Sequence, residues 1–99
     1  MNIQKMMKDL QRMQSKIQED IDALEVEATA GGGVVTARMT GRKFLTALTL
    51  QPDAITPDDP GLMQDLILAA VNEASRKVDA EVQRMTESLA GGLKIPGLS

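Results

Sequence analysis

The chain of 99 residues has no cysteine, histidine, tryptophan or tyrosine, and its one aromatic residue is Phe44. Without cysteine or histidine it has no thiolate nucleophile, no imidazole base and no zinc-finger ligand set. A single aromatic side chain is too few for the stacking platforms of RRM-type and single-strand-binding domains. These absences exclude the commonest metal sites, much of acid–base catalysis and one large class of nucleic-acid binding.

Long hydrophobic runs are also missing. No stretch approaches the roughly 20 apolar residues of a membrane span, and the N-terminus has no uninterrupted apolar segment of signal-peptide length. We therefore expect a cytoplasmic protein with no membrane partner. The chain is 42% hydrophobic and 25% charged, which is typical of a folded domain. Its length predicts one small domain that would gain stability from a partner subunit.

The formal net charge is −3, but the charges are segregated along the chain. Residues 1–18 contain four basic side chains and one acidic side chain, whereas residues 19–27 contain five acidic side chains and no basic one. Screening in physiological salt acts over about 8 Å, so a ligand responds to the local patch rather than to the average. The basic N-terminal segment is therefore a candidate binding surface.

Apolar residues recur at spacings of three and four through the first 24 residues, which predicts an amphipathic helix over about 2–24. The apolar stripe consists of Ile3, Met7, Leu10, Ile17, Ile21 and Leu24, widened by Met6 and Met13. On nearly the opposite side, within an arc of about 80°, lie Lys5, Lys8, Arg12 and Lys16. Like charges at these spacings repel by roughly 0.2–0.5 kcal/mol per pair, partly offset by Asp9. A solvated face is the ordinary interpretation of such a stripe, but the repulsion favours a polyanionic ligand.

After residue 24 the apolar period changes to two, which predicts a three-stranded antiparallel meander with turns at residues 31–33 and at Gly41. The expected strands are about 25–30, 34–40 and 44–50. Val35, Ala37 and Met39 would share one face of the sheet. The third strand has apolar residues on both faces, with Leu45 and Leu48 on opposite ones, so we expect one face to pack on a helix and the other to be half covered.

A proline-rich loop over residues 51–61 leads into a second helix over about 61–89, with Asp58 or Asp59 at its N-cap. Glycines end this helix, so residues 1–90 form a single domain and residues 91–99 a flexible tail. The fold class is α+β, in the order helix, three strands, helix. Methionines at helical spacing are predicted core residues, namely Met6, Met13, Met63 and Met85.

No catalytic or cofactor motif is present. The glycines at 31–33 lack the rest of a GxGxxG or GK[ST] fingerprint and precede a strand rather than a helix, so they predict a turn. Asp58 and Asp59 are two adjacent loop acids without further ligands, which would hold a metal only weakly. Serine and threonine hydroxyls have no base partner. We expect no enzyme activity, no cofactor, no metal and no small-molecule substrate.

Several segments carry a resemblance over essentially the whole chain. A Met- and Gln-rich basic first helix ends in LEVEATAGGGVVTARMTGR, a third strand leads to LTLQPDAI, the second helix contains MQDLILAAVNEASRKVDAEVQRM, and the tail contains GGLKIPG. In this order they closely resemble the YbaB/EbfC family of small bacterial nucleoid-associated proteins. The resemblance implies a tweezer-like homodimer joined through its sheets, with assembly above the dimer left open. It also implies binding to double-stranded DNA with low to modest sequence specificity, to bridge or compact DNA in the nucleoid.

The resemblance also implies which residues bind DNA. Helix tips that contact DNA in the family correspond here to Lys5, Lys8, Arg12 and Arg84, with Lys16, Arg76 and Lys77 further in. We expect Arg76 and Lys77 to lie near the level of Lys16. Asp79, Glu81 and Glu87 surround Arg84 on the second helix, which puts its share of the DNA surface in doubt.

Two other functions stay open. The first is a protein-interaction or holdase-like module that grips partner chains between helical arms, as prefoldin-like proteins do, and it predicts binding that survives high salt. The second is a membrane-surface role for the basic first helix. We rank the second last because the apolar stripe of that helix lacks Trp and Phe and is needed for packing.

Overall fold

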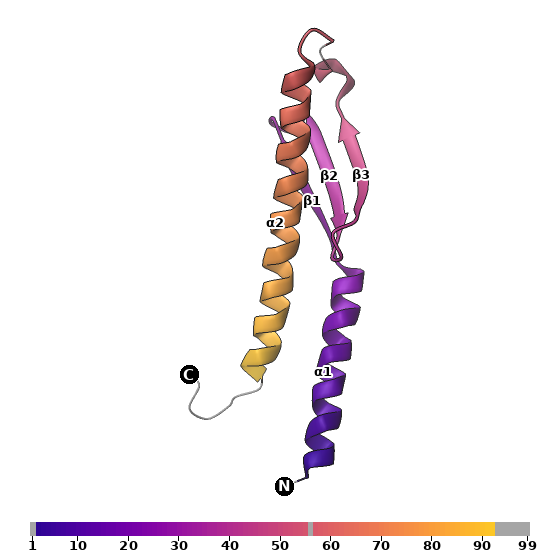
Figure 1. The fold of residues 1–99 in the computed structure, drawn as a ribbon, viewed down its shortest axis with the longest axis vertical. Helices are drawn as coiled ribbons and strands as arrows, with labels where there is room; N and C mark the ends of the chain where they lie inside the picture. The colour runs from indigo at the N-terminus through magenta and orange to yellow at the C-terminus, as the bar shows by residue number, and fades with distance from the viewer. Residues whose placement is uncertain (1, 56, 93–99) are drawn as a thin grey trace.

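The computed structural model of the protein describes residues 2–55 and 57–92. The elements follow in the order helix, three strands, a single 3-10 turn and a second helix. They are α1 (Ile3–Ala23), β1 (Glu25–Ala30), β2 (Val35–Thr40), β3 (Leu45–Leu50), η1 (Pro52–Ala54) and α2 (Pro60–Gly92). The α+β arrangement predicted from the sequence is therefore confirmed (Figure 1).

The three strands form one antiparallel sheet in the order β1-β2-β3, with Ala28 opposite Ala37 and Ala37 opposite Leu48. The turn between β1 and β2 is built from residues 31–33, whose φ angles are 65°, 70° and 98°. This left-handed region is open to glycine at little cost. The predicted role of the glycine run as a turn is therefore confirmed.

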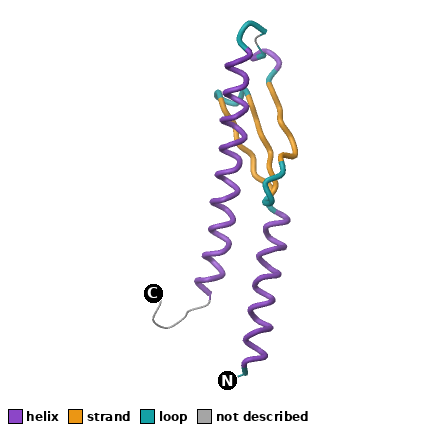
Figure 2. Tube along the Cα trace, viewed as in Figure 1, coloured by secondary structure: helices purple, strands orange, loops and turns teal. Residues whose placement is uncertain are grey.

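The core lies between one face of the sheet and α2, which crosses β1 and β2 (Figure 2). Its buried residues are Ala28, Val35, Ala37, Met39, Met63, Ala70, Ala74 and Val78. The alanines on α2 let the helix backbone approach the sheet closely. At the start of α2 the Asp59 Oδ1 accepts a hydrogen bond from the Leu62 N–H at 3.1 Å, which confirms one of the two predicted caps.

The expected faces of β3 were wrong because of a β-bulge. Arg38 pairs with Ala47 but the next residue, Met39, pairs with Leu45, so β3 has one extra residue at this point. A bulge moves the residues on its two sides out of simple alternation. Leu45 consequently joins Leu48 on the face where α2 lies, and both stay exposed, at 45% and 39%, since α2 covers the neighbouring strands.

The first helix projects beyond the end of the sheet (Figure 1). The molecule measures 69 × 25 × 15 Å, and its radius of gyration is 19.4 Å, against about 13 Å for a compact chain of this length. Because α1 contains no buried residue, its apolar stripe is exposed at Ile3, Met6, Met7 and Leu10. Figure 1 shows that the two helices run in opposite directions. The expected packing of the stripe is found only in part among the described residues, where Met13, Ile17 and Ile21 are half-buried.

The four methionines predicted to lie in the core differ in their burial. Met63 is buried in the core, as expected, and Met13 and Met85 are partly buried. Met6 is 53% exposed, so its predicted core position is wrong. Spacing shows that a residue lies on an apolar face, but whether a partner element reaches that face depends on the direction in which the helix leaves the sheet.

The second helix continues further than the sequence indicated. It runs through Gly92, so residues 91 and 92 are helical rather than part of a tail. The rest of the predicted tail, residues 93–99, lies outside the described residues. Over the described helices, no segment combines the length and the apolar character needed to cross a membrane.

Candidate nucleic-acid interface

The basic end of α1 starts at a well-formed cap. The Asn2 Oδ1 accepts hydrogen bonds from the backbone N–H groups of Gln4 and Lys5, at 3.1 and 3.3 Å. These bonds satisfy two of the free donors at the helix start. The first turn contains no acidic residue, so the positive end of the helix dipole and the Lys5 ammonium act in the same direction on an approaching anion.

The cations of α1 are exposed along the helix, as the sequence predicted. Across residues 2–55 and 57–92, no ion pair involves Lys5, Lys8 or Arg12. Asp9, which was expected to offset their repulsion, forms no ion pair with any of them. We call these three residues the α1 cations. Lys16, one turn further in, pairs with Asp20 at 3.3 Å. Three positive charges near the tip of α1 are therefore not neutralised by described residues of the chain.

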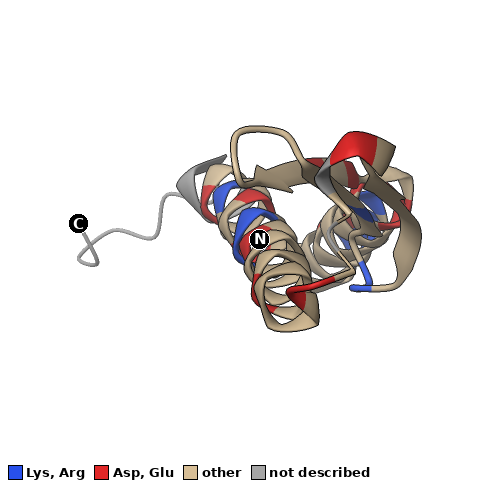
Figure 3. Cartoon of the chain, turned by 90° about the horizontal axis from the view of Figure 1, so that it is seen from above, with Lys and Arg blue, Asp and Glu red and all other residues tan. Residues whose placement is uncertain are grey.

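The surface beside these cations is a shallow hollow along one side of α1. It is lined by Lys8, Gln11, Arg12, Ser15, Lys16 and Glu19. All of the lining comes from one helix, so the hollow is open rather than enclosed. Such a surface suits the backbone of an extended polyanion better than a small molecule, which would need an enclosed pocket. Figure 3 shows Lys and Arg in blue and Asp and Glu in red on the helices, seen nearly end-on.

The cations of α2 are held by the chain itself. Arg76 pairs with Glu73 at 3.0 Å, and Arg84 pairs with Glu81 at 2.7 Å. The Arg84 guanidinium, by hydrogen bonding and charge, holds the pKa of Glu81 below its usual value, and Glu81 in turn raises the pKa of Arg84. Arg84 is therefore engaged with an acid of its own helix, as the acidic residues around it in the sequence suggested.

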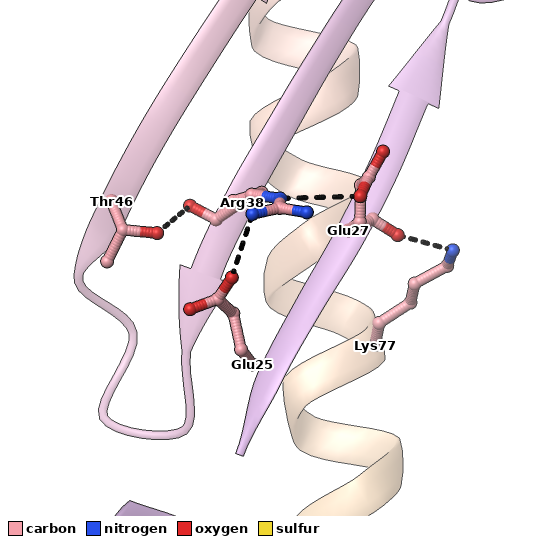
Figure 4. Close-up of polar contacts among 5 residues, drawn as sticks. All are labelled: Glu25, Glu27, Arg38, Thr46 and Lys77. Carbon is pink, nitrogen blue, oxygen red and sulfur yellow. Dashed lines mark hydrogen bonds and ion pairs between the residues drawn. The ribbon is translucent and has the colours of Figure 1, made fainter. Parts of the chain in front are cut away.

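The third cation of α2 lies beside the sheet. The Lys77 Nζ donates a hydrogen bond to the backbone carbonyl oxygen of Glu27 in β1 at 2.7 Å (Figure 4). This contact places Lys77 at the level of β1 instead of the level of Lys16. Arg38 bridges Glu25 and Glu27 at 3.4 Å each, so cations of the sheet region are engaged with its acids. Among residues 2–55 and 57–92, the cations without a bonded partner are concentrated on α1.

One exposed apolar surface has no signal in the sequence. Leu45 and Leu48 on β3 are exposed on the side where α2 lies, and Leu68 on α2 is 59% exposed. Leu68 is about 180° around α2 from Lys77, which faces β1, so it lies on the side of the helix away from β1. We call Leu45, Leu48 and Leu68 the β3–α2 apolar surface. Only the bulge and the position of α2 bring these residues to one side.

The described part of the chain offers little for metal chemistry. Over residues 2–55 and 57–92, no three His, Cys, Asp or Glu side chains gather in a way that could hold a metal ion. The arrangement places long flexible cations on a projecting helix.

Comparisons with known proteins identify the family of the chain. The family model described as "YbaB/EbfC DNA-binding family" matches residues 1–93. A nucleoid-associated protein of Acetivibrio thermocellus is 48% identical, over 98% of this chain and 89% of its own length. A nucleoid-associated protein of Chloroflexus aurantiacus is 40% identical, over 93% and 92% respectively.

A solved structure has a similar fold. The crystal structure of the uncharacterized protein HP0035 from Helicobacter pylori matches with a TM-score of 0.72, over 91% of this chain and 98% of that one, at 19% identity. The similarity at this identity concerns the fold alone. The match to the family model and the identity to the curated relatives extend over nearly the whole chain, and they settle its classification. This chain belongs to the YbaB/EbfC DNA-binding family.

Proposed function

We propose that the protein binds double-stranded DNA through the α1 cations and acts as a nucleoid-associated protein in the bacterial cytoplasm. The observation that carries this proposal is the state of Lys5, Lys8 and Arg12, which are exposed on a projecting helix and unpaired among the described residues. The names of the bacterial relatives, which are nucleoid-associated proteins, support the same location and partner.

The binding energy comes from phosphate contacts. Each Lys or Arg that neutralises a phosphate releases condensed counterions, and this contribution is nearly independent of base sequence. Lys16 joins the surface if a phosphate replaces its exposed partner Asp20, which is a small exchange because exposed ion pairs contribute little. Lys16 lines the same hollow as Lys8 and Arg12, whereas Arg76, Lys77 and Arg84 lie on α2, so we expect those three to contribute less. The expected sequence specificity is therefore low to modest.

A second copy of the chain completes the binding unit. The β3–α2 apolar surface is exposed to solvent in this elongated chain. A small domain has little buried apolar area to stabilise it, so covering this surface with a partner is favourable. We infer that a homodimer covers this surface and presents two α1 helices. Two such arms grip one duplex or bridge two segments, which compacts the chromosome.

The experiment is a titration of fluorescent duplex DNA followed by anisotropy. It compares the wild type with two variants that each lose three charges. The α1 triple variant is Lys5→Gln, Lys8→Gln and Arg12→Gln, and the α2 triple variant is Arg76→Gln, Lys77→Gln and Arg84→Gln. Glutamine keeps helix propensity close to that of Lys and Arg. We expect the α1 triple variant to lose binding and the α2 triple variant to keep most of it; equal losses would contradict the assignment to α1.

The alternative is a module that grips partner chains, and the exposed apolar stripe of α1 favours it. Ile3 at 69% and Met7 at 57% exposure could contact an unfolded segment. This function predicts that the protein suppresses aggregation of a chemically unfolded test protein at high salt. The α1 triple variant should do so equally well, because its apolar stripe is unchanged. Salt-resistant suppression without DNA binding would favour this alternative over the DNA-binding proposal.

A further inference from the structure

The turn between β2 and β3 lies where α1 leaves the sheet. The Gly41 N–H donates a hydrogen bond to the carbonyl oxygen of Leu24 at 3.0 Å. A Cβ added to Gly41 would lie 2.1 Å from the carbonyl oxygen of Ile21, closer than any real contact. The turn backbone is therefore pressed against the last turn of α1, at a distance that only glycine allows.

The next residue of the turn holds α1 by its side chain. Arg42 donates from Nε to the Asp22 Oδ1 at 2.5 Å and from Nη2 to the Gln18 Oε1 at 2.8 Å. The last turn of α1 contains no basic residue, so Arg42 supplies the positive charge that a helix C-terminus favours. Asp22, through this hydrogen bond and its charge, raises the pKa of Arg42.

The following residue holds the other helix. Lys43 has a φ of 67°, and its Nζ pairs with the Asp79 Oδ1 of α2 at 2.8 Å. Adjacent side chains of one turn thus contact α1 and α2 respectively. In α1 no residue is fully buried and only Met13, Ile17 and Ile21 of the apolar stripe are half-buried, so these polar contacts add to a small packing interface.

We propose that Gly41, Arg42 and Lys43 form a bracket that fixes the direction of α1 relative to α2. These are positioning residues: none of them is one of the α1 cations, and they act by holding α1 in place. The direction of α1 is a property of the fold, so this part of the proposal does not depend on the proposed function. Its consequence for DNA, namely that the bracket places the α1 cations at a set separation from α2, rests on the proposed function.

Two opposite charge changes separate positioning from simple electrostatics. Asp22→Asn raises the net charge by one, whereas Arg42→Gln lowers it by one. If only charge mattered, the first variant would bind DNA more tightly and the second more weakly. If the bracket positions α1, both variants bind about two- to threefold more weakly, the order expected when one exposed charge pair is lost. Asp53→Asn, which makes the same charge change on η1 at the far end of the sheet, is the matched control.

A distance measurement tests the bracket without DNA. The native chain has no cysteine, so Gln4→Cys on α1 and Ser88→Cys on α2 accept two spin labels at defined positions. Labelled chains are diluted into unlabelled ones, so that only distances within one chain are measured by pulsed electron resonance. We expect a narrow distribution in the otherwise native chain and in Asp53→Asn, and a broader or shifted one in Asp22→Asn and Arg42→Gln.

The exchanged pair Asp22→Arg with Arg42→Asp keeps the net charge and restores the contact, so it should recover the narrow distribution. Unchanged distributions in both single variants would overturn the bracket, whatever their DNA affinity. A broadened distribution in chains that do not bind DNA would retain the bracket and refute only the proposed function. Gly41→Ala gives an independent perturbation, and we expect it to shift the distribution because Ile21 must move. Unfolding curves establish that each variant is folded before it is labelled.

Discussion

The salt dependence of DNA binding should report how many α1 helices touch the duplex. Each phosphate neutralised on duplex DNA contributes about −0.9 to the slope of log affinity against log salt. The three α1 cations of one chain therefore give a slope of about −2.7, and those of two chains about −5.4. Between about 50 and about 200 mM salt these slopes correspond to losses of about 40-fold and about 1,800-fold in affinity.

The assay is a set of anisotropy titrations at four or more salt concentrations, with a duplex of mixed sequence. The α1 triple variant removes all three of these charges, so its slope should become shallower by about 2.7 for each α1 helix that touches the duplex. The α2 triple variant should keep the wild-type slope, because its cations are engaged with acids or with a backbone oxygen. A wild-type slope near zero, or an α1 triple variant with the wild-type slope, would refute the reasoning.

Three further predictions concern the assembly, the core and the pH response. Leu48→Glu places a charge on the β3–α2 apolar surface, so light scattering should report one chain where the wild type reports two; a persistent dimer would mean another interface. Ala74→Leu adds side-chain volume at a fully buried contact of α2 and should lower the free energy of unfolding by about 1–3 kcal/mol, measured by urea denaturation; an unchanged midpoint would contradict the packing. DNA affinity at fixed salt should be level between about pH 6 and 7, because the chain has no histidine. Glu81 has a lowered pKa, so its pair with Arg84 stays charged over that range. The stability that this pair contributes is lost only as the pH falls through the lowered pKa. A step in DNA affinity near neutrality would reveal an unrecognised titrating group.

The local elements were predictable from the sequence because each has a period of its own. Spacings of three and four gave both helices, and alternation with glycine turns gave the three strands within a residue of their observed bounds. The cap at Asp59 followed from local chemistry. The end of α2 was not predicted, since its glycines are compatible with a helix that continues to Gly92.

The arrangement of those elements was less predictable, because it depends on contacts between distant residues. An apolar stripe on α1 shows that a face can be buried, but not that a partner is present in the same chain. The contacts of Arg42 with Asp22 and of Lys77 with Glu27 span 20 and 50 residues, and no local pattern marks them. The α1 cations were found from the sequence because a charged stripe is a property of one helix.

The absence of buried residues in α1 has a consequence for its own folding. The part of α1 up to Arg12 is exposed at every residue, so it lies close to the balance between helix and coil, since packing supplies most helical stability in proteins. The repulsion among Lys5, Lys8 and Arg12 moves that balance toward coil, and a bound phosphate backbone removes the repulsion. DNA would therefore raise the helical population of the segment that holds it. Part of the binding free energy is then used to order this segment. Protection of the α1 amides from hydrogen exchange should increase as more of the protein is bound to DNA.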